Sequence, residues 1–265
     1  MTQTTCKNCT NEFEGNYCNL CGQSAKVKRF SFGYFLHETF FSSLDIEEGF
    51  FSTLLILFKH PGKGIRDYIE GKRVSLYVPG KFLLLFGAIA TFLAVRYQLF
   101  TNEQMENNIA GFSAYLQSFF NYAEENTTVI NLISIPAFAL SSYFVFYRQR
   151  FNYTEHLVLN IYITAMQLVM LILLFPLLEW VPSWHQESVL VYTILTFAYN
   201  IWVYLSFFRA GHFRGLLLVL LAMVLAYIGQ FILNLFIYSA LVRFGVLSPA
   251  DYVAPEFQMY IEQFF

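Results

Sequence analysis

Five apolar stretches, each long enough to cross a lipid bilayer as a helix, constrain this chain more than any other feature of its sequence. A helix needs roughly 20 predominantly apolar residues to cross about 30 Å of hydrocarbon with its backbone groups hydrogen-bonded internally. The stretches run from about Phe82 to Phe100, Thr128 to Tyr147, His156 to Leu178, Ser188 to Phe208 and Gly215 to Val242. The chain is therefore expected to be an all-α membrane protein with about five transmembrane helices.

Positive charges alternate along the chain in step with these stretches. Basic residues cluster before the first stretch, and pairs of arginines follow the second and the fourth. Hydrophobic residues make up 57% of the sequence and charged residues only 13%, a balance that soluble domains rarely have. Because cytoplasmic loops retain Lys and Arg, the pattern predicts a cytoplasmic N-terminus and an extracytoplasmic C-terminus.

The segment before the first stretch has no apolar run of the kind that a signal peptide requires. Residues 1–29 are polar and contain cysteine, and the run from Phe50 to Phe58 is too short to span a membrane. That run is expected to form an interfacial helix. The predicted organisation is a cysteine module at 1–29, an amphipathic and interfacial juxtamembrane segment at 30–81, a five-helix transmembrane domain at 82–242 and an extracytoplasmic tail at 243–265.

All the cysteines lie in two Cys-x-x-Cys pairs near the N-terminus, Cys6 with Cys9 and Cys18 with Cys21. Two such pairs place four thiolates around one tetrahedral zinc ion, and a closed shell of sulfur ligands indicates a structural role. Unligated thiols and a redox pair are the alternatives, although no βαβ pattern surrounds either pair. The basic residues that follow are explained by the positive-inside rule, so a nucleic-acid partner is not expected.

A basic cluster lies just before the first apolar stretch. Two interpretations stay open for it: recognition of anionic lipid headgroups or a docking partner, and a topology determinant with no recognition role. The residues concerned are Lys63, Arg66, Lys72, Arg73 and Lys81.

Uncharged polar residues recur within the apolar stretches at helical spacing. They either hydrogen-bond neighbouring helices together or line a polar cavity for a small ligand or lipid headgroup. The set consists of His156, Asn160, Thr164 and Gln167 on one predicted helix, Asn200 on the next, and Gln230 and Asn234 on the last. No nucleophile elbow, P-loop, zinc-protease or dinucleotide motif is found, so the protein is not expected to be an enzyme.

Several short motifs resemble those of a bacterial family, DUF3667. They are the cysteine pairs with Gly22-Gln23, then Pro61-Gly62, then Tyr68-x-x-Gly71-Lys72-Arg73, and Tyr77-x-x-Pro79. The resemblance implies a short zinc-ribbon start, several membrane helices and a place in the bacterial inner membrane, and it implies no reaction. The expected function is non-enzymatic docking or scaffolding on the lipid bilayer, with an anionic lipid or another protein as partner. The alternative is a transporter or channel for a small solute or lipid.

Overall fold

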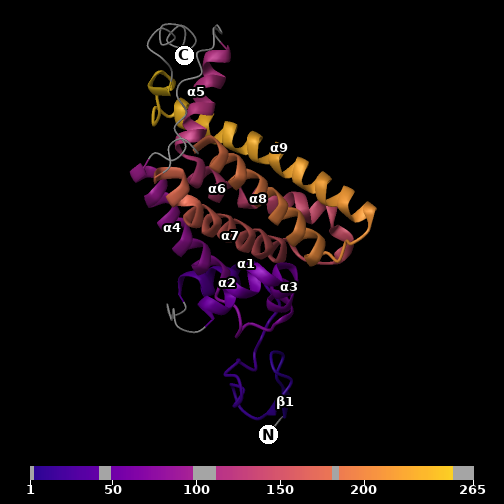
Figure 1. Ribbon diagram of the computed structural model, residues 1–265. Helices are drawn as coiled ribbons and strands as arrows, with labels where there is room; N and C mark the ends of the chain where they lie inside the picture. The colour runs from indigo at the N-terminus through magenta and orange to yellow at the C-terminus, as the bar shows by residue number, and fades with distance from the viewer. Residues whose placement is uncertain (1–2, 42–48, 98–111, 181–184, 253–265) are drawn as a thin grey trace.

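The computed structural model describes residues 3–41, 49–97, 112–180 and 185–252, and most of these residues are helical. Five long helices form a bundle in which the chain passes back and forth (Figure 1). They are α4 (Pro79–Tyr97), α6 (Thr127–Val145), α7 (Tyr153–Trp180), α8 (His185–Phe207) and α9 (Phe213–Arg243). A 3-10 turn, η1 (Tyr147–Gln149), follows α6. The predicted all-α fold is confirmed.

Helix α7 lies at the centre of the bundle. Of its apolar window 67% is buried, compared with 33%, 28% and 22% for the windows of α6, α8 and α9. It packs against α4, α6 and α8, and α9 packs mainly against α6. A helix that is apolar on every side must be surrounded by other helices or by lipid, and α7 has the first arrangement.

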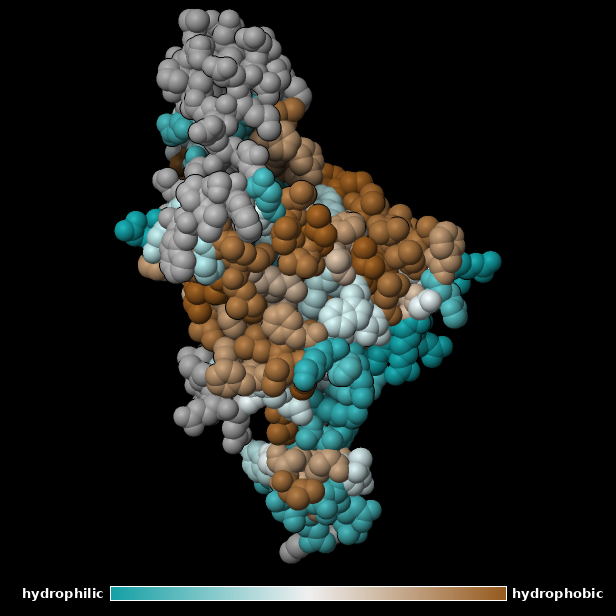
Figure 2. Space-filling view, in the orientation of Figure 1, coloured by the Kyte–Doolittle hydropathy of each residue, from teal (hydrophilic) through white to brown (hydrophobic). Residues whose placement is uncertain are grey.

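Four of the described helices are long and apolar enough to cross a membrane: Thr128–Val145, Tyr153–Leu177, Glu187–Phe207 and Phe213–Arg243. The remaining predicted crossing, Phe82 to Phe100, corresponds to α4, which is apolar over the shorter range Pro79–Ala94. The predicted end at Phe100 lies outside the described residues. Large apolar side chains such as Leu217, Leu221 and Ile228 are exposed on α9. Figure 2 shows this apolar surface as a broad brown band across the bundle. Hydrocarbon is the solvent that suits such a surface.

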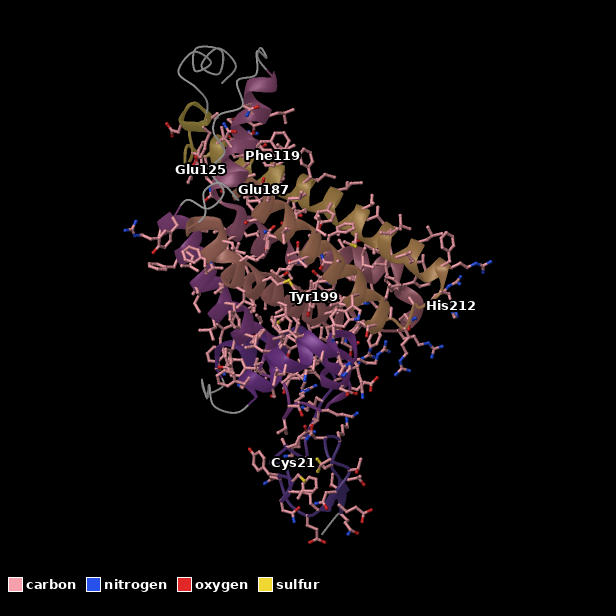
Figure 3. All side chains as sticks on the ribbon, in the orientation of Figure 1. Cys21, Phe119, Glu125, Glu187, Tyr199 and His212 are labelled. Carbon is pink, nitrogen blue, oxygen red and sulfur yellow. The ribbon has the colours of Figure 1, made fainter. Side chains whose placement is uncertain are left out.

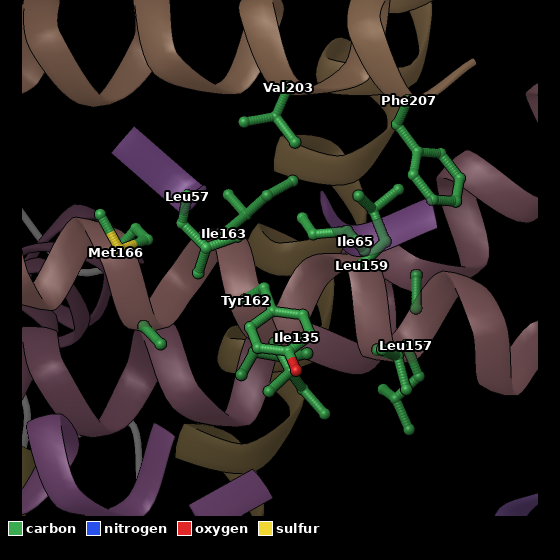
Figure 4. Close-up of a cluster of buried hydrophobic side chains, with 14 of the residues drawn as sticks. Leu57, Ile65, Ile135, Leu157, Leu159, Tyr162, Ile163, Met166, Val203 and Phe207 are labelled. Atoms are coloured by element: carbon green, nitrogen blue, oxygen red, sulfur yellow. The ribbon is translucent and has the colours of Figure 1, made fainter. Parts of the chain in front are cut away.

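Three short helices, α1 (Phe32–Phe40), α2 (Phe50–Lys59) and α3 (Pro61–Glu70), form a layer across one end of the bundle (Figure 1). Helix α3 begins with Pro61 at its first turn and ends at Gly71, whose φ of 117° is readily adopted only by glycine. Leu57 and Ile65 from this layer are fully buried among side chains of α7 and α8, as Figure 4 shows. Helices therefore form in the predicted juxtamembrane segment, and they share one core with the bundle.

The opposite end of the bundle carries α5 (Phe112–Glu125) and the 3-10 turn η3 (Pro249–Tyr252), for which the sequence analysis expected no element. Tyr238 of α9 donates a hydrogen bond to Ser118 Oγ at 2.8 Å, and Asn121 donates to the carbonyl of Tyr252 at 2.7 Å. These contacts hold α5 against the end of α9. Most of the predicted tail, residues 253–265, lies outside the described residues.

The N-terminal module is the smallest part of the fold and lies beyond the α1–α3 layer (Figure 1). Its two strands, β1 (Thr4–Thr5) and β2 (Glu12–Phe13), pair antiparallel with Thr4 opposite Phe13. Among its described residues, Cys6, Phe13 and Cys18 form the buried apolar core. So small a core cannot stabilise a fold by apolar burial alone, and such modules usually require a metal or disulfides.

Candidate metal centre

The sulfur atoms of Cys6, Cys9, Cys18 and Cys21 converge within 4.8 Å of one another. The Sγ atoms of Cys6 and Cys21 are 3.5 Å apart, and those of Cys9 and Cys18 are 3.6 Å apart. Four sulfurs bound tetrahedrally at a zinc–sulfur distance of about 2.3 Å would lie about 3.8 Å from one another. The observed spacing therefore fits a single ion at the centre of the cluster.

The two Cys-x-x-Cys pairs reach this geometry through the same backbone turn. Thr10 N–H donates to the carbonyl of Cys6 at 2.9 Å, and Gly22 N–H donates to the carbonyl of Cys18 at the same distance. Both turns place the residue after the second cysteine in the left-handed region, with φ of 62° at Thr10 and 73° at Gly22. The local sequence thus directs both thiols of each pair to one point.

Backbone donors favour the thiolate form in the second pair. The backbone N–H of Gln23 lowers the pKa of Cys21. Burial opposes ionisation of Cys18, but the N–H groups of Leu20 and Cys21 outweigh it and lower the pKa of Cys18 to about 6. Thiolates are the form in which cysteine binds metal.

A cluster of four thiols cannot carry four negative charges without a cation. The backbone N–H of Asn11 favours the Cys9 thiolate, yet burial and the other three sulfurs raise the pKa of Cys9 to about 12. A divalent ion would reverse this effect, because a coordinated thiol loses its proton. Since all four ligand positions come from cysteine, the arrangement suits a structural metal and leaves no position for substrate.

Gln23, which follows the second pair, joins the module to the rest of the protein. Its buried side chain donates from Nε2 to the carbonyl of Gly71 at 2.8 Å and accepts from the Arg73 N–H at 3.0 Å. A Cβ at Gly71 would lie 3.0 Å from the Lys7 side chain, so the backbones approach closely here. Two motifs that are 48 residues apart in the chain are therefore in direct contact.

Arg73 strengthens the same junction from the opposite side. Its Nη2 donates to the carbonyl of Lys28 at 2.7 Å, and its guanidinium lies 4.1 Å from the ring centroid of Phe30 and 5.0 Å from that of Tyr34. A planar guanidinium stacks well on aromatic faces. The Gly71-Lys72-Arg73 motif thus holds the linker, residues 24–31, that follows the cysteines.

The linker is also attached to the start of α7. Arg29 donates to both carboxylate oxygens of Glu155, from Nε at 2.7 Å and from Nη2 at 2.8 Å. Asn152 donates from Nδ2 to the carbonyl of Phe30 at 2.9 Å. Asn152 and Glu155 also accept one another's backbone N–H, which is the capping-box arrangement at a helix start. The spacing Asn152-x-x-Glu155 is a sequence signal for this capping box, and the sequence analysis missed it.

The structure divides the predicted basic cluster into two groups. Lys63 and Lys72 are exposed, and Lys72 forms an ion pair with Asp67 at 3.0 Å. Arg66 and Lys81 are buried, at 9% and 4% exposure, and Arg73 is half-buried. These five residues therefore do not form one continuous surface.

The polar residues of the bundle pair with one another across helices. On α7, the Nδ1 atom of His156 lies 2.9 Å from the Ser142 hydroxyl of α6. Asn160 donates to the carbonyl of His156 at 2.8 Å and accepts from the hydroxyl of Tyr204 on α8 at 2.7 Å. The Nε2 atom of His156 is buried and has no hydrogen-bond partner among the described residues. The sequence analysis did not predict a role for Ser142 or Tyr204, because only the packing of the helices brings them next to His156 and Asn160.

The other predicted polar residues are Thr164 and four amides. Thr164 is half-buried on α7. The amides form two amide pairs, Gln167 with Asn200 at 3.1 Å and Gln230 with Asn131 at 3.2 Å, and Asn234 donates to the hydroxyl of Ser134 at 3.1 Å. Every amide in the predicted set has a partner on a neighbouring helix, an arrangement that favours packing over a cavity.

Replacing Asn160 by Leu is expected to destabilise the bundle in detergent by about 1–2 kcal/mol, because the buried Tyr204 hydroxyl loses its acceptor. Thermal unfolding of the purified protein measures this loss. Tyr204→Phe and the double variant complete a mutant cycle, and Met170→Leu, half-buried on the same helix, is the control. Equal stability of wild type and Asn160→Leu would contradict the packing role.

Part of the chain matches the model of a known protein family. Residues 47–91 match the model of the family described as "Protein of unknown function (DUF3667)". These residues include α2, α3 and the start of α4, with their Pro-Gly, Gly-Lys-Arg and Tyr-x-x-Pro motifs. No curated protein and no solved structure matches the chain. Over this segment the chain is similar to the DUF3667 family, whose function is unknown.

Proposed function

We propose that the protein is a non-enzymatic membrane protein that binds one structural zinc ion and presents its metal-folded module as a docking surface for another protein. The observation that supports this function best is the attachment of a closed four-sulfur cluster to the bundle through Gln23 and Arg29. A module held in this way keeps one orientation relative to the membrane. A fixed, preorganised surface binds a partner at a lower entropic cost than a mobile one.

The proposal includes the orientation of the chain, with the module in the cytoplasm of a bacterial cell. The turns at the module's end of the bundle carry Arg148, Arg150 and Arg209, and Arg214 lies at the start of α9, whereas Glu125, Glu187 and Asp251 lie toward the other end. Figure 3 shows nitrogen tips gathered around the end that includes His212 and α3. The positive-inside rule supports a cytoplasmic location for that end.

A reporter that is active only outside the cytoplasm should be silent when fused after Gly211 and active at the C-terminus.

The exposed apolar residues of the module supply the docking surface. Tyr17 and Leu20 are 68% and 71% exposed, although the module has few other large apolar side chains. They lie beside Cys18 and Cys21 in the chain, so the metal would hold them in place. Apolar and aromatic side chains held rigidly at a surface are typical of interface anchors.

A photo-crosslinking amino acid at position 20 is expected to give one discrete product in intact cells. The same amino acid at Lys59, which is exposed on α2 outside the module, is the control. The product should disappear when Cys18→Ser is added, because the surface depends on the metal. A product that forms equally from position 59, or that survives Cys18→Ser, would contradict the docking function.

A transporter or channel has less support from the geometry. Solute pathways through bundles are lined by polar groups that lack protein partners. Here the amides of Asn160, Gln167, Gln230 and Asn234 are all paired with side chains of neighbouring helices.

A further inference from the structure

Arg66, on α3, has a guanidinium that lacks a hydrogen-bond acceptor in the described part of the protein. The residue is only 9% exposed, and its Nη2 atom is fully covered without a partner. A guanidinium carries five N–H donors and no acceptor. Because a buried charged donor without a partner is costly, this arrangement calls for an acceptor that the described residues do not supply.

Aromatic rings hold the guanidinium of Arg66 in position. Its Cζ atom lies 5.2 Å from the ring centroid of Phe207, at the end of α8, and 5.6 Å from that of Phe151, in the turn before α7. Gly62 allows α3 to approach α8 closely, since a Cβ there would lie 2.3 Å from the backbone nitrogen of Phe207. The rings orient the charge of Arg66 and shield it, but they accept no hydrogen bond in the plane of the guanidinium.

The charges around Arg66 also favour an anion. Burial lowers the pKa of Arg66, and the positive charge of Arg209 lowers it further. Asp67 and Glu70 act in the opposite direction, but Asp67 forms its ion pair with Lys72, and neither carboxylate hydrogen-bonds Arg66. Arg209 is exposed just after α8 and has a left-handed backbone, with φ of 51°. The charge of Arg209 therefore acts on Arg66, and neither nearby carboxylate neutralises Arg66 through a hydrogen bond.

We propose that Arg66 and Arg209 form a binding site for a phosphate group, placed where α3 meets the end of α8. Guanidinium groups match phosphate oxygens with paired, charge-assisted hydrogen bonds. The hydrophilic region beside α3 borders the apolar band in Figure 2, which is the depth of lipid headgroups in a membrane. The phosphate can belong to an anionic phospholipid or be free in solution. The site depends neither on the metal nor on a protein partner.

The test compares the full-length protein, purified and stripped of lipid in detergent, with and without two probes. One probe is inorganic phosphate, measured against chloride at equal ionic strength. The other is phosphatidylglycerol in mixed micelles, measured against phosphatidylcholine. Thermal unfolding and native mass spectrometry report binding. We expect Arg66→Gln and Arg209→Gln each to weaken the apparent affinity by roughly tenfold, the effect of losing a hydrogen bond to a charged group.

Lys59→Gln is the matched control, because it removes one positive charge from an exposed position at the same end of the molecule. Binding of inorganic phosphate assigns the site to a free ligand, and selective binding of phosphatidylglycerol assigns it to a lipid headgroup. The proposal is overturned if neither probe binds wild type, or if Lys59→Gln weakens binding as much as Arg209→Gln does. If Arg66→Gln does not fold, Arg66→Lys, which keeps the charge, and Arg209→Gln decide the question. Zinc content should be the same in all these variants, which separates this test from that of the metal centre.

Discussion

Purified wild-type protein is expected to contain one zinc ion per chain, and the variant with Cys18→Ser and Cys21→Ser is expected to contain none. The variant keeps only two of the four sulfur ligands, and the buried apolar core among the described residues of the module is small, consisting of Cys6, Phe13 and Cys18. Structural zinc contributes about 10–16 kcal/mol of apparent binding free energy in zinc-finger peptides, far more than so small a core can supply. Elemental analysis measures the metal, and limited proteolysis measures the unfolding of the module.

The membrane bundle should survive this change, because none of the four cysteines lies in it. Its thermal unfolding in detergent is therefore expected to stay within about 1 kcal/mol of wild type, the range of distant surface changes. Thr10→Gly is the control within the module, since glycine relieves the left-handed backbone at Thr10 and leaves every ligand in place. Metal-free wild type, or unchanged zinc in the double serine variant, would refute the metal centre.

Gly62→Ala is expected to destabilise the bundle by about 3 kcal/mol. A Cβ at this position would lie 2.3 Å from the Phe207 nitrogen and 2.6 Å from the carbonyl carbon of Ser206. Both contacts are with backbone, which cannot rotate away as a side chain can. Alanine favours a helix by about 1 kcal/mol over glycine, so the clash must overcome that gain. Thermal unfolding in detergent measures the net effect.

Gly87→Ala is the matched control for this substitution. Gly87 is also helical, but a Cβ there would lie 3.6 Å from the Leu132 side chain, an ordinary contact. The control is expected to be as stable as wild type, or slightly more stable because of helix propensity. If Gly62→Ala unfolds at the temperature of Gly87→Ala or above it, the close packing of α3 on α8 is not what holds the two helices together.

Hydropathy predicted most of the helical architecture correctly. The predicted crossings near Thr128, His156, Ser188 and Gly215 correspond to α6, α7, α8 and α9, and the apolar run from Phe50 to Phe58 corresponds to α2. Helix α5 was not predicted, because it carries Gln117, Asn121 and Glu125 among its apolar residues and is stabilised by α9. The two cysteine pairs were predicted to converge, and the structure brings their sulfur atoms within 4.8 Å.

The basic cluster shows where sequence reasoning fell short. Arg66 and Arg73 share a short segment rich in positive charge with Lys63 and Lys72, and nothing local distinguishes the four residues. In the structure, Arg66 lies between Phe151 and Phe207, and Arg73 lies on Phe30. The rings of Phe151 and Phe207 come from parts of the chain far from Arg66. The sequence predicted the presence of charge near the membrane but not which charges are buried.

By itself, the sequence determined that this chain forms apolar helices and one cysteine cluster, because hydropathy and ligand spacing act over a few turns of chain. Only the tertiary structure decided which polar and charged side chains meet. Arg29 and Glu155 form their ion pair across 126 residues, and Gln230 and Asn131 pair across 99. Such pairs have no local signature, because a hydrogen bond depends on the position of two groups in space and is indifferent to the length of chain between them.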